Sequence, residues 1–151
     1  MLRGLATEEE TVARDEKLDL LRSVPLFADL DRHHLERLGM LTEEVDVPAG
    51  KVLMHQGDHG DDLMVIVSGS VAVERNGAAL AGLGAGDFFG EIALVAEGPR
   101  TATVTTASPT RLLVVSHRDF HALMDEFPEV AARVLMTLAH RLRALEPNAL
   151  I

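Results

Sequence analysis

The chain has 151 residues, a formal net charge of −10 and a pI near 5.0. This length suits one domain with a buried core, and the acidic balance disfavours non-specific binding to nucleic acid or to an anionic membrane surface. The absence of cysteine excludes disulfides, thiol catalysis and thiolate metal sites. The first ten residues lack the apolar run of a secretory signal, and no stretch has the roughly 18 apolar residues of a membrane span. We therefore expect a soluble, cytoplasmic protein.

Helical patterns open the chain. Acids follow Thr7 in the manner of a capping box and predict a helix over about residues 8–22. Leu35, Leu38 and Leu41 recur at helical spacing and predict a second helix over about 31–41. Residues 1–23 are thus expected to form an N-terminal helical segment.

From Glu43 onward the hydrophobic period changes to two, which is typical of strands. Asn76-Gly77 is the strongest short hairpin signal, because both residues tolerate a positive φ. Short strands separated by turn residues at regular spacing predict about eight strands in a barrel-like β-roll. The segments with this pattern are residues 43–47, 51–54, 63–67, 70–75, 80–83, 101–105 and 111–115.

Two helices are predicted at the C-terminal end. Ser116 begins another capping-box pattern for a helix to about Glu126, and Pro128 suits the first position of a final helix over 128–146. Apolar residues of that helix recur at spacings of four and three, as in a heptad seam. These residues are Ala131, Leu135, Leu138, Leu142 and Leu145. The seam fits either a dimer helix or packing onto the chain's own barrel.

Residues 88–104 carry the most informative pattern, Phe-Phe-Gly-Glu-Ile-Ala-Leu-Val-Ala-Glu-Gly-Pro-Arg-Thr-Ala-Thr-Val. Glu91 stands at the start of a short helical turn, where backbone N–H groups are unpaired, and Arg100 precedes a strand. A guanidinium facing a helix start closes an anion site, and a carboxylate can accept from a hydroxyl. The combination predicts a pocket for a phosphate beside a sugar hydroxyl, as in a cyclic nucleotide.

Each residue of this pattern also has a simpler interpretation. Glu91 can merely serve the helix dipole, and Arg100 can be a surface arginine in a salt bridge. The alternation after Pro99 leaves open whether Arg100 points into or out of the barrel. In the ligand interpretation, Gly90, Ile92 and Ala93 offer backbone N–H groups to the phosphate, and glycine permits close approach.

The run from Phe89 through Val104 resembles the phosphate-binding cassette of the cyclic nucleotide-binding domain family. That family includes catabolite-activator-type regulators, regulatory subunits of cyclic nucleotide-dependent kinases, and cyclic nucleotide-gated channels. Upstream, Gln56-Gly57-Asp58 and residues 65–71 resemble its barrel glycine motifs. The resemblance covers about residues 24–145. It implies a mainly β fold with flanking helices: a jelly-roll-like β-roll, or double-stranded β-helix, over 24–127 with the cassette at 88–104, and a lid or dimer helix over 128–146.

The resemblance also implies roles for single residues. Glu91 would accept from the ribose 2′-OH, and Arg100 would neutralise the phosphate. Thr101 would reach the phosphate or a guanine amino group, although a threonine there is also simply a good strand residue and does not select the base. Arg141 would approach the nucleotide from the last helix, with a solvated helix arginine as the alternative. The Thr-Ser pair that contacts adenine in catabolite activators is absent, because Leu145-Glu146 stands there.

The implied function is a bacterial sensor domain that binds cAMP or cGMP, with cAMP favoured, and that needs no other cofactor. The last helix would swing in as a lid and control an effector that the sequence does not identify. Three alternatives differ in class. The chain can be part of a catabolite-activator-type regulator without its DNA-binding domain, or a scaffold of the same fold that binds nothing. An enzyme such as a phosphodiesterase is disfavoured, since no catalytic constellation stands out. His117 and His121 have the i,i+4 spacing of a metal pair but no evident third ligand.

Overall fold

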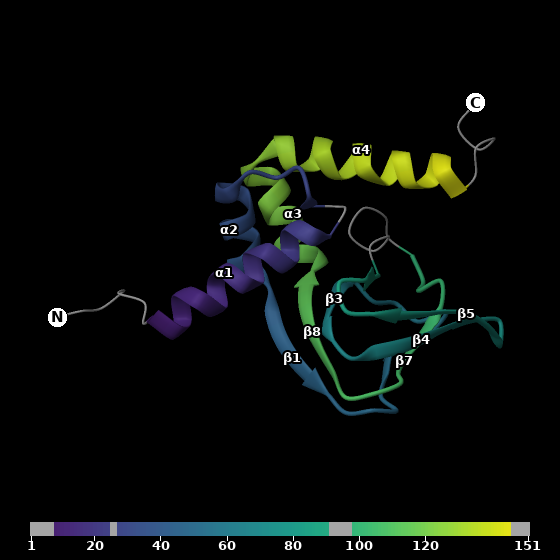
Figure 1. Ribbon diagram of the computed structural model, residues 1–151. Helices are drawn as coiled ribbons and strands as arrows, with labels where there is room; N and C mark the ends of the chain where they lie inside the picture. The colour runs from purple at the N-terminus through teal and green to yellow at the C-terminus, as the bar shows by residue number, and fades with distance from the viewer. Residues whose placement is uncertain (1–7, 25–26, 91–97, 146–151) are drawn as a thin grey trace. The chain divides into compact units, whose positions relative to one another are not determined.

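The computed structural model describes residues 8–24, 27–90 and 98–145 (Figure 1), with side chains left out of the description at 8–13, 141, 144 and 145. The chain divides into two compact units. One, the helical unit, joins residues 1–40 to residues 127–151, and the other, the β unit, comprises residues 41–126. Among the described residues, no helix is long and apolar enough to cross a membrane.

The helical unit contains α1 (Glu8–Ser23), α2 (Arg32–Leu41) and α4 (Pro128–Leu145). Leu18 and Leu21 of α1 are buried, and both lie close to Gly39 of α2, where an added Cβ would be 3.5 Å from Leu18 Cδ2. This is an ordinary van der Waals distance, so α1 and α2 pack against each other through Leu18, Leu21 and the surface around Gly39. His34 links α2 to α4, since Nδ1 lies 3.3 Å from Asp31 Oδ1 and Nε2 lies 3.1 Å from Glu129 Oε1.

The β unit contains two four-stranded antiparallel sheets, in the orders β1-β8-β3-β6 and β2-β7-β4-β5 (Figure 1). Neighbours in each sheet are often distant in sequence, as in β1 against β8, which is the topology of a roll rather than a meander. The strands are β1 (Glu43–Val47), β2 (Val52–Met54), β3 (Asp62–Ser68), β4 (Ser70–Arg75), β5 (Ala78–Gly84), β6 (Phe88–Phe89), β7 (Thr103–Thr106) and β8 (Thr110–Ser116). The predicted fold class, a β-roll with flanking helices, is confirmed.

The core of the roll takes buried side chains from both sheets, including Met64, Val71, Phe89, Val104 and Leu112. Strand β3 is apolar on both faces, because Leu63 and Val65, which alternate with its core residues, are also buried. The helix α3 (His117–Glu126) contacts β8 within the same unit, and its Phe120 and Leu123 are buried. A strand covered on two faces reads as a continuous apolar run, which explains the sequence of residues 63–67.

Local sequence signals account for two boundaries. Asn76 and Gly77 have φ of 53° and 79° and form the two-residue turn between β4 and β5, as predicted. Ser116 Oγ accepts a hydrogen bond from the Asp119 N–H at 3.1 Å and so caps α3, also as predicted. Strand bounds differ from the expectation in several places, and β5 begins at Ala78 rather than at residue 80. Strand β7 begins at Thr103 rather than at residue 101, and β6, a pair of phenylalanines, is too short to show any periodicity.

Candidate functional site

Arg100 is surrounded by residues 57–62, which we call the arginine loop. The Arg100 N–H donates to the Asp58 carbonyl at 2.8 Å, and the Gly57 N–H donates to the Arg100 carbonyl at 2.9 Å. An isolated antiparallel bridge pairs His59 with Pro99. Both backbone groups of Arg100 are thus paired with this loop, so the position from which its side chain starts is fixed.

The guanidinium of Arg100 is held by the same loop. Its Nη1 and Nη2 both donate to the carbonyl oxygen of Asp62, each at 3.1 Å. Among the described residues its hydrogen-bond partner is therefore a backbone carbonyl rather than a carboxylate. A neutral partner orients the cation without neutralising it, which leaves its charge available to an anion.

Two glycines pack directly against this guanidinium. An added Cβ at Gly60 would lie 2.5 Å from Arg100 Nε, and one at Gly90 would lie 3.0 Å from Arg100 Nη1 and 2.5 Å from the Asp62 carbonyl oxygen. Gly90 also has a φ of +84°, in the left-handed region that favours glycine. Both positions need glycine because any side chain would displace the arginine or the carbonyl that holds it.

The electrostatics of the site follow from partial burial. Burial lowers the pKa of Arg100, and the neighbouring charges of Asp62 and Asp61 oppose that effect. Burial likewise raises the pKa of Asp62, together with repulsion from Asp61 and Glu43 and against the attraction of Arg100. The site is thus a half-buried cation that is attracted by the charges of Asp61 and Asp62. Among the described residues, neither carboxylate forms an ion pair or a hydrogen bond with it.

The structure brings two of the predicted site residues together, namely Gly90 and Arg100. Thr101 follows Arg100 and is exposed, and its carbonyl accepts a hydrogen bond from Arg75 Nε at 2.8 Å. Glu91, Ile92 and Ala93 lie outside the described residues. Arg141 lies on α4, in the helical unit, and its side chain is also outside the description.

Residues 44–127 match the family model of the cyclic nucleotide-binding domain. The chain belongs to the cyclic nucleotide-binding domain family.

The domain is similar to proteins of several kinds. It shares 37% sequence identity and a TM-score of 0.78 with the N-terminal domain of a transcriptional regulator from Streptomyces coelicolor A3(2), over 86% of this chain and 96% of that one. The regulatory domain of Toxoplasma gondii PKA, crystallised with cAMP, is 28% identical with a TM-score of 0.70, over 79% of this chain and 46% of that one.

Among curated proteins, a cyclic nucleotide-gated potassium channel of Rhizobium etli is 38% identical over 122 residues, which are 81% of this chain and 34% of the channel. The domain therefore spans about a third of the length of that relative. The fold is shared by regulators, a kinase regulatory domain and a channel, so membership of the family does not by itself define the effector.

Sequence reasoning missed Gly60, Asp62 and Arg75. The glycines and acids of residues 57–62 indicated a loop, but nothing local indicated that this loop would enclose Arg100, about 40 residues further on. The resemblance of Gln56-Gly57-Asp58 to the family's barrel glycine motifs marked the start of this loop but not its contact with Arg100. Asp62 holds Arg100 through its backbone carbonyl. Every residue type has a backbone carbonyl, so the identity of residue 62 does not predict this contact.

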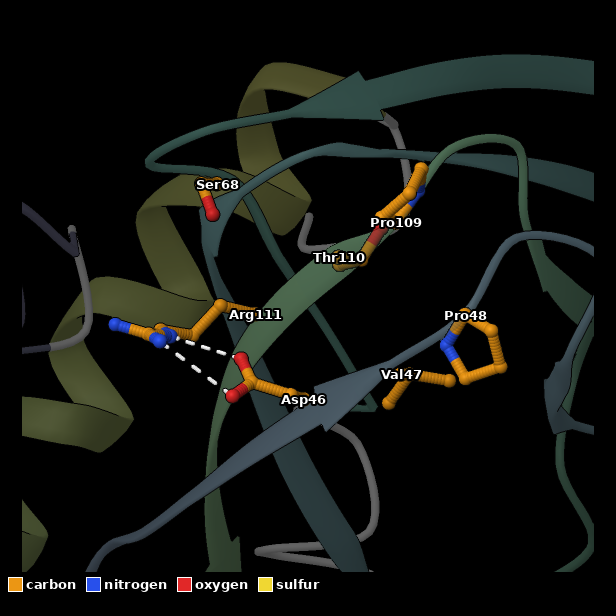
Figure 2. Close-up of a pocket in the computed structure, with 7 residues that line it drawn as sticks. All are labelled: Asp46, Val47, Pro48, Ser68, Pro109, Thr110 and Arg111. Atoms are coloured by element: carbon orange, nitrogen blue, oxygen red, sulfur yellow. Dashed lines mark hydrogen bonds and ion pairs between the residues drawn. The ribbon is translucent and has the colours of Figure 1, made fainter.

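Figure 2 shows an open surface pocket of the same unit, with a volume of about 530 Å³. Arg111 Nε and Nη2 donate to the two carboxylate oxygens of Asp46 at 2.9 and 3.4 Å, as the dashed lines mark (Figure 2). This hydrogen bond lowers the pKa of Asp46. The pocket is lined by Asp46, Val47, Pro48, Ser68, Pro109, Thr110 and Arg111. Its arginine is already paired with a carboxylate, and none of the predicted ligand residues lines it.

The histidine pair lies on α3, where the rings of His117 and His121 have centroids 4.1 Å apart. Within the described ranges, no group of three or more His, Asp or Glu side chains is arranged to hold a metal ion. The two rings pack against each other at the start of a helix that is also fixed by its serine cap.

Proposed function

We propose that this domain binds a 3′,5′-cyclic nucleotide, with cAMP preferred to cGMP, as a regulatory sensor without enzymatic activity. The observation that carries the proposal is the Arg100 guanidinium, half-buried and oriented by the Asp62 carbonyl at 3.1 Å, with Gly90 against it. A cyclic phosphodiester carries one negative charge, which one guanidinium can match. Family membership supports the ligand class, and the cAMP found with the Toxoplasma domain supports the choice of base.

The remaining cassette residues take their roles from this ligand. Gly90, Ile92 and Ala93 would donate backbone N–H groups to the phosphate, and Glu91 would accept from the ribose 2′-OH. Thr101 would add a hydroxyl beside Arg100, and Arg141 would approach the nucleotide from α4, the proposed lid. The nucleotide would be the only small molecule required, the domain would act in the cytoplasm, and its effector would sense the position of α4.

We also propose that α4 mediates a homodimer. Leu135, Met136 and Leu142 are 66, 58 and 44% exposed, whereas Val130 and Val134 of the same helix are buried. One face of α4 is thus used within the chain, and the exposed face carries two of the residues of the predicted heptad seam.

Calorimetric titration of nucleotide-stripped protein with cAMP and with cGMP tests the main proposal. Saturable binding is expected for cAMP and weaker binding for cGMP. Arg100→Ala should abolish the binding of both nucleotides, because the phosphate then has no charged partner. Arg111→Ala is the matched control, since it removes an arginine of the same unit whose charge is already paired with Asp46. Unchanged affinity in Arg100→Ala contradicts the assigned site, and no heat from either nucleotide with folded protein favours a non-binding scaffold.

A second candidate is the sensor part of a transcriptional regulator. The likeness to the Streptomyces regulator domain, of which this chain covers 96%, favours it. The net charge of −10 argues against DNA binding by these residues themselves. A gel-shift assay on the full gene product, with and without cAMP, distinguishes the two: nucleotide-dependent binding to DNA supports the regulator, and nucleotide binding without any DNA binding supports the first proposal.

A further inference from the structure

We propose that Asp61 and Asp62 make this site selective for charge, so that it accepts a singly charged phosphodiester and rejects the doubly charged phosphomonoester of a linear nucleotide. The inference rests on the proposed function, since it concerns the ligand held by Arg100. It assigns to the arginine loop a role in specificity in addition to its structural role.

Hydrogen bonds of their backbones hold both acidic residues in place, Asp62 against the guanidinium and Asp61 against α3. The Asp62 carbonyl accepts from Arg100 Nη1 and Nη2. The Asp61 carbonyl accepts from the His117 N–H at 2.7 Å, at the first residue of α3. The backbone of the loop is therefore tied to the arginine on one side and to a helix on the other, so the positions from which the two carboxylates project are fixed when an anion approaches.

The charges of these residues act on Arg100 without neutralising it through contact. Attraction to Asp62 and Asp61 opposes the effect of burial on the pKa of Arg100, and mutual repulsion contributes to the raised pKa of Asp62. Partial burial strengthens such interactions, since less water lies between the charges. The same two carboxylates therefore repel any further negative charge that is placed at the guanidinium.

The number of charges on the ligand then decides the outcome. A cyclic diester has one ionisable oxygen and is a monoanion, whereas a phosphomonoester loses its second proton near pH 6 and is close to a dianion above pH 7. The first negative charge is matched by Arg100. The second is an additional negative charge at the same guanidinium, and the charges of Asp61 and Asp62 repel it. Opening of the cyclic ester elsewhere in the cell would thus convert a ligand into a non-ligand.

The test compares the dissociation constants of cAMP and of adenosine 5′-monophosphate at pH 7.5 and low salt. Competition against a fluorescent cAMP analogue gives both values for the wild type and for Asp61→Asn/Asp62→Asn. We expect the preference for cAMP over the monophosphate to fall by roughly fivefold for each carboxylate removed, and the effect to shrink at high salt. Glu74→Gln/Asp125→Asn is the control, because it removes two exposed charges of the same unit that have no part in the pKa shift of Arg100, and it should leave the preference unchanged.

The outcomes separate this inference from the proposed function. If the wild type binds cAMP and the double variant keeps the full preference, or still shows no binding of the monophosphate, the inference is wrong and the proposed function stands. If the wild type binds no cyclic nucleotide, the proposed function fails first. If the double variant does not fold, the single variants Asp61→Asn and Asp62→Asn provide the same comparison. Each should show part of the fall in the preference for cAMP over the monophosphate.

Discussion

The guanidinium of Arg100 and the backbone carbonyl of Asp62 form a fixed pair, in which two N–H donors share one oxygen at 3.1 Å. The two residues are 38 positions apart, so the pairing exists only in the folded β unit. A carbonyl carries no charge and does not titrate, so it orients the arginine at any pH at which the protein is folded. An incoming anion can therefore meet an oriented cation without first breaking a salt bridge.

The first prediction concerns Gly60, whose small size this pair requires. In Gly60→Ala the new methyl group would lie within 3.0 Å of three guanidinium atoms, at 2.5 Å from Nε, so the side chain of Arg100 must move. We expect nucleotide affinity to fall by roughly tenfold or more with little change in melting temperature, because the clash is with a side chain rather than with the core. Calorimetry and thermal unfolding measure the two effects.

Gly82→Ala is the control for this prediction. Its added Cβ would meet only the Val71 carbonyl oxygen at 3.9 Å, which is an ordinary contact, so both affinity and stability should stay close to the wild type. Equal affinities for the two alanine variants would show that the position of Arg100 does not determine binding.

The second prediction concerns the exposed face of α4. Leu135→Glu places a charge on the seam that we propose to form the dimer, and like charges then face each other across the two-fold axis. We expect the protein to become monomeric in sedimentation experiments while it stays folded, because Leu135 is 66% exposed within the single chain. Arg133→Glu changes an exposed residue of the same helix outside the seam and should leave the oligomer intact. The dimer proposal fails if the wild type sediments as a monomer at every concentration.

The sequence predicted those parts of the molecule that depend on neighbours along the chain. The hairpin turn follows from Asn76-Gly77, which tolerate a positive φ. The start of α3 follows from Ser116, whose hydroxyl accepts a hydrogen bond from the backbone N–H of Asp119, three residues further along the chain. Pattern alone left the direction of Arg100 open, since its position depends on the Asp62 carbonyl and on the absence of a side chain at Gly60. These are contacts between segments that are distant in the sequence. A contact made by a backbone group does not depend on the residue type, so the sequence does not predict it. The resemblance to the cassette located the site, whereas the physical reason for its geometry needed the fold.

The third prediction concerns Gly69, between β3 and β4. Its φ is +96°, and an added Cβ would lie 2.5 Å from the Pro109 carbonyl oxygen and 2.5 Å from Thr110 Oγ1. Gly69→Ala therefore combines backbone strain with overlap against another backbone, and we expect a loss of about 1–3 kcal/mol or more in the free energy of unfolding.

Gly50→Ala separates these two causes. Gly50 has a similar φ of +81°, but an added Cβ would have nothing within 4 Å, so this variant carries the strain alone. Chemical denaturation should rank the wild type above Gly50→Ala and Gly50→Ala above Gly69→Ala. The reverse order of the two variants would show that overlap at Gly69 is relieved by movement of residues 109–110.

The last prediction uses the opposite pKa shifts of Asp62 and Asp46. Burial, with repulsion from Asp61, raises the pKa of Asp62 in the folded protein. Its contribution to stability is therefore most favourable below the unfolded pKa, near 4, and is lost as the pH rises through the folded value. At neutral pH the ionised Asp62 costs stability, so Asp62→Asn should unfold at a higher denaturant concentration than the wild type at pH 7. This gain should shrink as the pH falls towards about 3, where the wild-type carboxyl is protonated.

Asp46 provides the control of opposite sign. The hydrogen bond from Arg111 lowers the pKa of Asp46, so its contribution to stability is present above the unfolded pKa and is lost as the pH falls through the folded value. Asp46→Asn should therefore be slightly less stable than the wild type at pH 7, because the pair is exposed to solvent, and equal to it in acid. Urea titrations of the three proteins between pH 3 and 7 should thus show the two variants deviating from the wild type in opposite directions at neutral pH and converging in acid. A loss of stability in Asp62→Asn at pH 7 would show that attraction to Arg100 outweighs the burial and repulsion that act on that carboxylate.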